Sequence, residues 1–108
     1  MTTNRLTLLH QFYEEDPTDP FNGYALALEY VNQNPEQAQF YFDQLLTNHA
    51  NYLPTYYHAA ALYAELQQPQ QAQILYKKGM ELAQNQQQIR TFQELQRALR
   101  ALEDENEW

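Results

Sequence analysis

Apolar residues recur at intervals of three and four positions along most of the chain, which is the spacing of one face of an α-helix. Leu6, Leu9 and Phe12 follow this spacing near the N-terminus, and Leu95 and Leu99 follow it near the C-terminus. No β-hairpin signal interrupts the pattern. The pattern predicts six helices, at residues 3–15, 20–33, 35–47, 54–66, 69–83 and 89–104. We therefore expect an all-α protein.

Polar residues mark several of the expected helix starts. Thr2 or Thr3 can cap the first helix, and Asp19 stands before a proline that suits the first position of the second helix. Asn34 holds the same place before the third helix, and Gln37, three residues later, completes a candidate capping box. Prolines also open the fourth and fifth helices. Such short connections require neighbouring helices to lie antiparallel.

One stretch of the sequence occurs twice. Asn34–Leu46 reads NPEQAQFYFDQLL and Gln68–Met80 reads QPQQAQILYKKGM, so a proline, a Gln-Ala-Gln triplet and an aromatic residue each recur 34 positions later. A period of this length is typical of helix-turn-helix repeats. The chain is therefore predicted to contain two copies of one helical hairpin.

These residues resemble the tetratricopeptide repeat family, whose pattern places small residues where paired helices touch and aromatic residues late in the first helix and in the second. The matching structural positions are Leu26, Ala27, Tyr30, Ala38, Phe42 and Leu45 in the first unit and Ala59, Ala60, Tyr63, Ala72, Tyr76 and Gly79 in the second. The first unit has one residue fewer between its two helices than the second. Ala50 and Gln84 stand where the family usually has proline.

The resemblance implies a right-handed superhelical stack of antiparallel helix pairs, forming a single domain over residues 1–108 with about six helices. A helical pair cannot bury its apolar face alone, so helices at each end would complete the stack. The expected parts are an N-terminal packing helix (3–16), repeat 1 (20–52), repeat 2 (53–86), a C-terminal capping helix (89–104) and an acidic tail (105–108).

The resemblance also implies a concave groove lined by the first helix of each repeat, in which a segment of a partner protein binds. Tyr24 and Tyr57 hold the same position of successive repeats. The expected partner-binding residues are Tyr24, Leu28, Val31, Asn32, Tyr57, Ala61, Ala64 and Glu65. Tyrosine is a favoured contact residue because it offers a large surface with a hydrogen-bonding tip. The alternative is that both tyrosines only pack against neighbouring helices.

Some family members clamp an acidic chain terminus with basic groove residues. This sequence has Tyr, Leu, Val and Ala at the matching positions, so that activity is not expected here. An apolar groove instead favours an extended or helical peptide with hydrophobic anchors.

The charge of the chain narrows the range of partners. The formal net charge is −8 at pH 7 and the isoelectric point is near 4.6, which disfavours nucleic acid and anionic membrane surfaces. The sequence contains no cysteine, no secretory signal and no apolar run long enough to span a bilayer. We therefore expect a cytoplasmic protein without a cofactor.

Catalytic and metal-binding signals are weak. His10, His49 and His58 lie on three different predicted elements without the spacing of metal ligands. No nucleophile elbow, phosphate-binding loop or isolated acid/base pair is recognisable. The sequence therefore predicts a non-catalytic protein–protein interaction module.

A second hypothesis is a structural role through self-association. A short repeat array can leave an apolar face open, for example the outer side of the capping helix, and a second copy could cover it to form a homodimer. Trp108 ends an acidic tail that is expected to fray, where it could contact a partner or be disordered.

Overall fold

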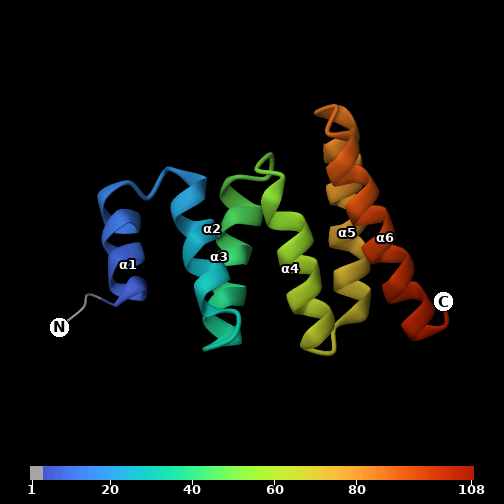
Figure 1. Ribbon diagram of the computed structural model, residues 1–108, viewed down its shortest axis with the longest axis horizontal. Coiled ribbons are helices and arrows are strands. Elements are labelled where there is room, and N and C mark those ends of the chain that lie inside the picture. The colour runs from blue at the N-terminus through green and yellow to red at the C-terminus, as the bar shows by residue number, and fades with distance from the viewer. Residues whose placement is uncertain (1–3) are drawn as a thin grey trace. The chain divides into compact units, whose positions relative to one another are not determined.

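The computed structural model describes residues 4–108, which form six α-helices and no β-strand (Figure 1). The helices are α1 (Arg5–Glu15), α2 (Pro20–Tyr30), α3 (Pro35–Asn48), α4 (Pro54–Glu65), α5 (Pro69–Asn85) and α6 (Ile89–Asn106). The prediction of an all-α protein with six helices is confirmed.

Two compact units divide the chain at residues 52 and 53. In the N-terminal unit, α2 packs against both α1 and α3. In the C-terminal unit, α5 packs against both α4 and α6. Each unit thus contains one complete helical hairpin, α2–α3 or α4–α5, and one additional helix.

Side chains cap the three helices of the N-terminal unit. Asp19 Oδ1 accepts a hydrogen bond from the Phe21 N–H at 3.0 Å, as expected from the sequence. Thr2 and Thr3 lie outside the described residues, and Asn4 caps α1 instead, with its Oδ1 accepting from the Leu6 N–H at 2.7 Å.

The capping box predicted at α3 forms only in part. Asn34 Oδ1 accepts from the Gln37 N–H at 3.3 Å. The Asn34 N–H, which the Gln37 side chain was expected to bind, instead donates to the Tyr30 carbonyl at 2.7 Å. Helix α2 ends at Tyr30 rather than near Gln33, where the Val31 and Gln33 N–H groups bond to carbonyls only three residues back and tighten the chain into a turn.

All three helices of the C-terminal unit end in the same way. The residues that follow them, Gln67, Gln87 and Glu107, adopt left-handed backbone conformations with φ of 64°, 58° and 56°. In each case the next N–H reaches back five residues to a helical carbonyl, as in a Schellman motif. The Trp108 N–H makes this bond to the Glu103 carbonyl at 3.1 Å, and α6 includes Glu105 and Asn106, which were expected to belong to the tail.

The positions that carry the family resemblance form most of the core. Leu26, Ala27, Ala38, Phe42, Ala59, Ala60, Tyr63, Ala72 and Tyr76 are all buried. Tyr30, expected among the core aromatic residues, is only half-buried. The alanines allow the paired helices of each hairpin to approach closely, because a larger side chain would separate them.

In each hairpin a glycine on one helix lies against a large side chain on the other helix, but the helix that carries the glycine differs between the two hairpins. A Cβ atom built on Gly23 of α2 would lie 3.6 Å from the Leu45 side chain on α3. A Cβ atom built on Gly79 of α5 would lie 2.7 Å from the Tyr56 Cβ on α4. Gly23 and Tyr56 hold equivalent positions on the first helices of the two hairpins. Leu45 and Gly79 hold equivalent positions on the second helices. Each hairpin therefore pairs a glycine with a large residue, in reversed order.

Helix α6 turns a polar side to solvent. Leu95, Leu99 and Leu102 are buried on its inner side. Apart from Ile89 and Ala101, its exposed positions are polar or charged. The expectation that the outer side of the capping helix is apolar is therefore wrong.

Candidate functional site

Tyr24 is the half-buried aromatic residue of the first predicted binding surface. Its ring meets the Tyr52 ring edge-on, with centroids 5.7 Å apart, and lies 6.5 Å from the Phe21 ring. Burial raises the pKa of the Tyr24 hydroxyl above its ordinary value, and Tyr52 adds to this shift. The hydroxyl therefore stays protonated at neutral pH, where it can both donate and accept a hydrogen bond.

Three further residues continue this surface along and just beyond α2. Leu28 is 36% exposed, Val31 is partly exposed and Asn32 is exposed. Residues spaced by four and then three or four positions share one side of a helix. We call Tyr24, Leu28, Val31 and Asn32 the first tyrosine strip.

The second tyrosine strip consists of Tyr57, Ala61, Ala64 and Glu65 on α4. Tyr57 is 39% exposed, Ala61 and Ala64 are partly exposed, and Glu65 is exposed. Both strips thus combine an aromatic ring, aliphatic surface and a polar end.

Tyr57 rests on a buried tyrosine of the same unit. Its ring meets the Tyr76 ring edge-on at 6.2 Å, and Tyr76 itself is only 5% exposed. Burial, with Tyr57 and Glu105 nearby, raises the pKa of Tyr76 to about 12. Tyr24 and Tyr57 therefore each pack on another tyrosine while part of their surface remains open.

Residues from all three helices of the N-terminal unit form a cluster of rings that the sequence reading did not foresee. The Tyr30 hydroxyl hydrogen-bonds to His10 Nε2 at 2.8 Å. The Tyr30 ring stacks on Tyr41 with centroids 6.0 Å apart and planes within 3°. Tyr13 meets Tyr41 edge-on at 5.5 Å. Tyr30 thus links α1 to α3 instead of filling the core.

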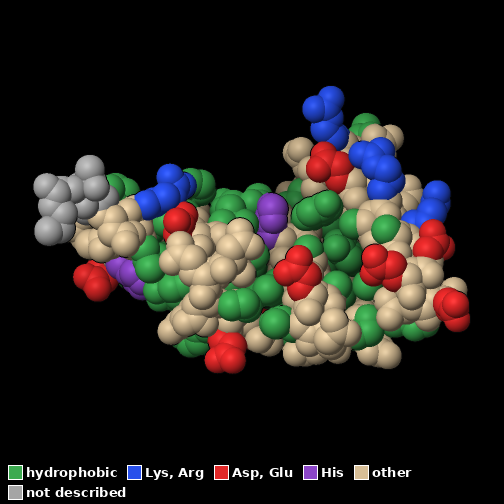
Figure 2. All heavy atoms as spheres, turned by 60° about the horizontal axis from the view of Figure 1, so that its bottom comes forward, with side chains coloured by type: hydrophobic (Ala, Val, Ile, Leu, Met, Phe, Trp, Pro, Cys, Tyr) green, Lys and Arg blue, Asp and Glu red, His purple; other side chains and the backbone are tan. Residues whose placement is uncertain are grey.

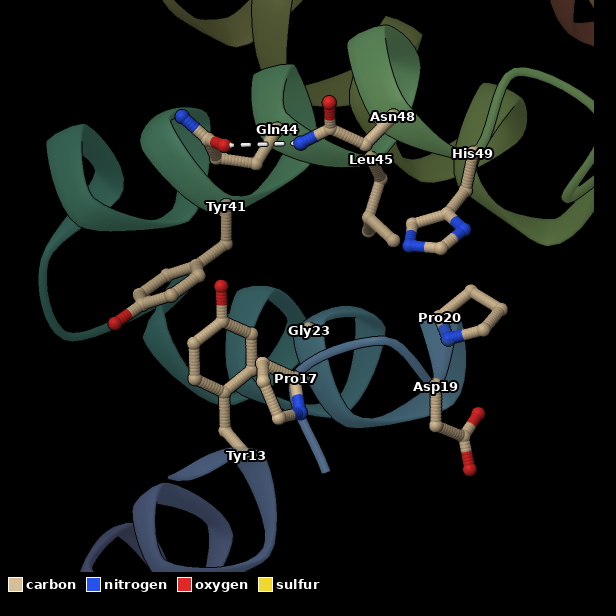
Figure 3. A pocket seen from close by; sticks show the side chains of 10 residues that line it. All are labelled: Tyr13, Pro17, Asp19, Pro20, Gly23, Tyr41, Gln44, Leu45, Asn48 and His49. Carbon is tan, nitrogen blue, oxygen red and sulfur yellow. Dashed lines mark hydrogen bonds between the residues drawn. The ribbon is translucent and has the colours of Figure 1, made fainter. Parts of the chain in front are cut away.

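A small pocket lies beside this cluster, between α1, α2 and α3 (Figure 3). Tyr13 and Tyr41 approach each other at one end, and His49 faces Pro20 at the other. The pocket exists because Gly23 has no side chain to fill the space in front of Leu45. Its volume of about 30 Å³ matches one water molecule, so it is too small for an organic substrate.

The distribution of charge differs between the units. The N-terminal unit has seven acidic residues and one basic residue, and the C-terminal unit has seven acidic and five basic residues. On the face drawn in Figure 2, most of the basic side chains lie over α5 and α6. The N-terminal unit therefore carries most of the negative charge, with a formal charge of −6 against −2.

Two searches of residues 4–108 were negative. No helix in that range combines the length and apolar character needed to cross a membrane. No three or more His, Asp or Glu side chains in it gather closely enough to hold a metal ion.

Two solved structures decide the family. The chain is 36% identical to a tetratricopeptide repeat domain protein from Salinibacter ruber, solved by NMR in solution; the match has a TM-score of 0.78 and covers 82% of this chain and 91% of that one. A crystal structure of a tetratricopeptide repeat domain protein from the same organism matches with 35% identity and a TM-score of 0.75, over 79% of this chain and 97% of that one. The chain belongs to the tetratricopeptide repeat family.

Neither a family model nor a curated protein matches this tetratricopeptide repeat protein. Membership of the family makes it a helical repeat protein of a kind that generally mediates protein–protein interaction. The resemblance predicted from the repeated stretch of sequence is thereby confirmed.

The Gly23 pocket is the feature of the site region that sequence reasoning missed. A signal was present, because Gly23 stands 33 residues before Tyr56 and the equivalent residues of the two repeats differ greatly in size. The ring cluster had a weaker signal, because nothing in the sequence indicates that His10 lies beside Tyr30 and Tyr41.

Proposed function

We propose that this tetratricopeptide repeat protein is a non-catalytic module that binds a segment of another protein through its two tyrosine strips. The observation that carries the proposal is the partial exposure of Tyr57, at 39%, and Leu28, at 36%, on the first helices of the two hairpins. Large apolar groups held in place by a packed neighbour contribute most to peptide binding, since little entropy is lost when they are covered.

The charge of the protein indicates the kind of segment. The first tyrosine strip belongs to a unit with a formal charge of −6. A segment with aromatic or aliphatic anchors and flanking lysine or arginine residues would be attracted to this unit, and attraction of this kind mainly accelerates association. We expect its affinity to weaken as the salt concentration rises.

The test is selection of peptides from a random displayed library on the wild-type protein. Peptides that bind are then measured against Tyr57→Ala and Leu28→Ser. We expect losses of about tenfold or more, because each change removes an exposed anchor-contact surface. Melting curves show whether each variant remains folded.

A matched control separates the strips from other apolar surface. Phe40 on α3 and Ile74 on α5 are 51% and 46% exposed, and they lie on the second helix of each hairpin. Phe40→Ala and Ile74→Ala should leave peptide binding unchanged. If the control variants lose binding and the strip variants keep it, the strips are not the binding surface.

A further inference from the structure

Helix α1 carries an exposed apolar face. No residue of α1 is buried, and Leu8 and Phe12 are 40% and 50% exposed. The side of α1 that faces the rest of its unit instead holds His10 and Tyr13, which contact Tyr30 and Tyr41. Leu8 and Phe12 therefore keep much of their side-chain surface open, although the Phe12 carbonyl accepts a hydrogen bond from Asn22 of α2 at 3.2 Å.

Comparison with α3 explains why this face is open. The Asp16 N–H closes α1 on the Phe12 carbonyl, as the His49 N–H closes α3 on the Leu45 carbonyl. This register makes Phe12 the counterpart of Leu45, which is 3% exposed because α2 lies against it. Within residues 4–108, no helix precedes α1 to cover Phe12 in the same manner. In this register, α1 corresponds to the second helix of a hairpin.

The exposed face has the layout of a helix-pairing seam. Arg5, Leu8, Phe12 and Glu15 follow each other at intervals of three, four and three residues. This is the spacing that keeps one line of side chains facing a partner helix. Its middle is apolar and its two ends carry opposite charges. Arg5 donates to Glu29 of α2 at 2.8 Å through Nε only, and its side chain remains 75% exposed.

We propose that a second copy of this chain covers this face, with the two α1 helices packed antiparallel. In that arrangement Leu8 of each copy lies opposite Phe12 of the other, and Arg5 lies opposite Glu15. A parallel arrangement would place like charges opposite each other at both ends. The charge pattern of the seam therefore selects the antiparallel pair.

This interface closes at two copies. An antiparallel pair of identical helices has twofold symmetry, so it leaves no second seam for a third copy. Helix α6 does not extend the assembly, because its exposed side is largely polar. One eleven-residue helix from each copy makes a small interface, and we therefore expect a weak, concentration-dependent dimer. The proposal does not depend on the tyrosine strips, which lie on α2 and α4.

The first test is sedimentation of the wild-type chain over the widest concentration range its solubility allows. We expect a monomer–dimer equilibrium that Leu8→Ser/Phe12→Ser weakens about tenfold or more, because four apolar side chains leave the dimer interface. The melting temperature, compared at a concentration where both chains are monomeric, should change little because Leu8 and Phe12 are exposed. Ile74→Ser/Ile89→Ser is the matched control, since these residues are 46% and 72% exposed elsewhere.

The second test uses the charges to establish direction. Arg5→Glu alone and Glu15→Arg alone should each weaken self-association, since each places like charges opposite one another in the antiparallel pair. A mixture of the two variant chains should associate more strongly than either variant by itself, because opposite charges then face each other at both ends. Circular dichroism checks that losing the Arg5–Glu29 pair leaves α1 folded.

A wild-type chain that stays monomeric at every concentration would overturn the proposal and leave the face to a helix of another protein. Equal weakening by the control variant would place the dimer interface elsewhere. Arg5→Glu and Glu15→Arg chains that each self-associate as strongly as the wild type would exclude the antiparallel register, because only a parallel pair already places like charges opposite each other.

Discussion

Gly23 and Gly79 lie in comparable helical hairpins, but a Cβ atom added at each would have very different amounts of space. The nearest side-chain atoms to a Cβ on Gly23 are 3.6 Å away, an ordinary contact distance, next to a pocket of about 30 Å³. A Cβ on Gly79 would come within 2.7 Å of Tyr56 and 3.1 Å of Leu95. Only the second glycine is therefore required by close packing.

Substitution by alanine should move the stability of the protein in opposite directions at these two residues. Gly23→Ala is expected to raise the free energy of unfolding by about 0.5–1 kcal/mol, because alanine favours the helix and fits the space. Gly79→Ala is expected to lower it by about 1–3 kcal/mol through overpacking against Tyr56 and Leu95. Urea denaturation of both variants measures the two changes, and a shift of the same sign in both would contradict the packing described.

How much of the candidate site could be predicted from the sequence also depended on individual residues. Tyr24 and Tyr57 could be singled out because they recur at equivalent positions with aliphatic neighbours. Their support by Tyr52 and Tyr76 could not be foreseen, since it depends on ring orientations in the folded units. The expectation that Tyr30 fills the core is wrong for the same reason, because its hydroxyl is bonded to His10 and the residue stays half-buried.

At the level of helices, starts were easier to predict than ends. Asp19 and Asn34, each followed by proline, locate the starts of α2 and α3 because capping side chains act locally. The ends of α4 and α5 carry glutamine at the left-handed position that glycine usually occupies, so no local signal marks them. Helix α5 accordingly extends to Asn85, two residues beyond the expected end.

Glycine at these helix ends should stabilise the protein. A residue with a Cβ atom is strained in the left-handed region, whereas glycine is not. Gln67→Gly and Gln87→Gly are each expected to raise the free energy of unfolding by up to about 1 kcal/mol, after allowing for the greater freedom of glycine in the unfolded chain. Thermal and urea unfolding measure the change.

The same substitution inside a helix provides the control. Gln84 is exposed within the last turn of α5, so Gln84→Gly should lower stability by about 0.5–1 kcal/mol. Stabilisation at Gln84, or loss at both Gln67 and Gln87, would argue against left-handed strain at the helix ends.

For the molecule as a whole, negative charge opposes folding. The net charge is −8, and residues 1–52 hold seven carboxylates against Arg5 alone. Repulsion among surface charges is relieved when salt screens it. We expect the melting temperature to rise between very low and physiological ionic strength, with a gain in stability of about 1 kcal/mol or less.

Glu14→Gln should reduce this dependence on salt. Glu14 lies in the last turn of α1, where the helix dipole disfavours a negative charge and no basic residue compensates it. Melting temperatures of both chains are compared at one protein concentration across a salt series. A melting temperature that falls as salt is added would mean that attractive ion pairs such as Arg5–Glu29 outweigh the repulsion.

The reversed glycine contact also limits how the two repeats can recombine. A chimera that joins α2 to α5 would bring Gly23 against Gly79 and leave a hole, whereas one that joins α4 to α3 would force Tyr56 against Leu45. Crossovers between whole hairpins keep each large residue with its glycine. Duplication of this chain during evolution is therefore expected to tolerate exchange in units of one hairpin, and to reject exchange of single helices.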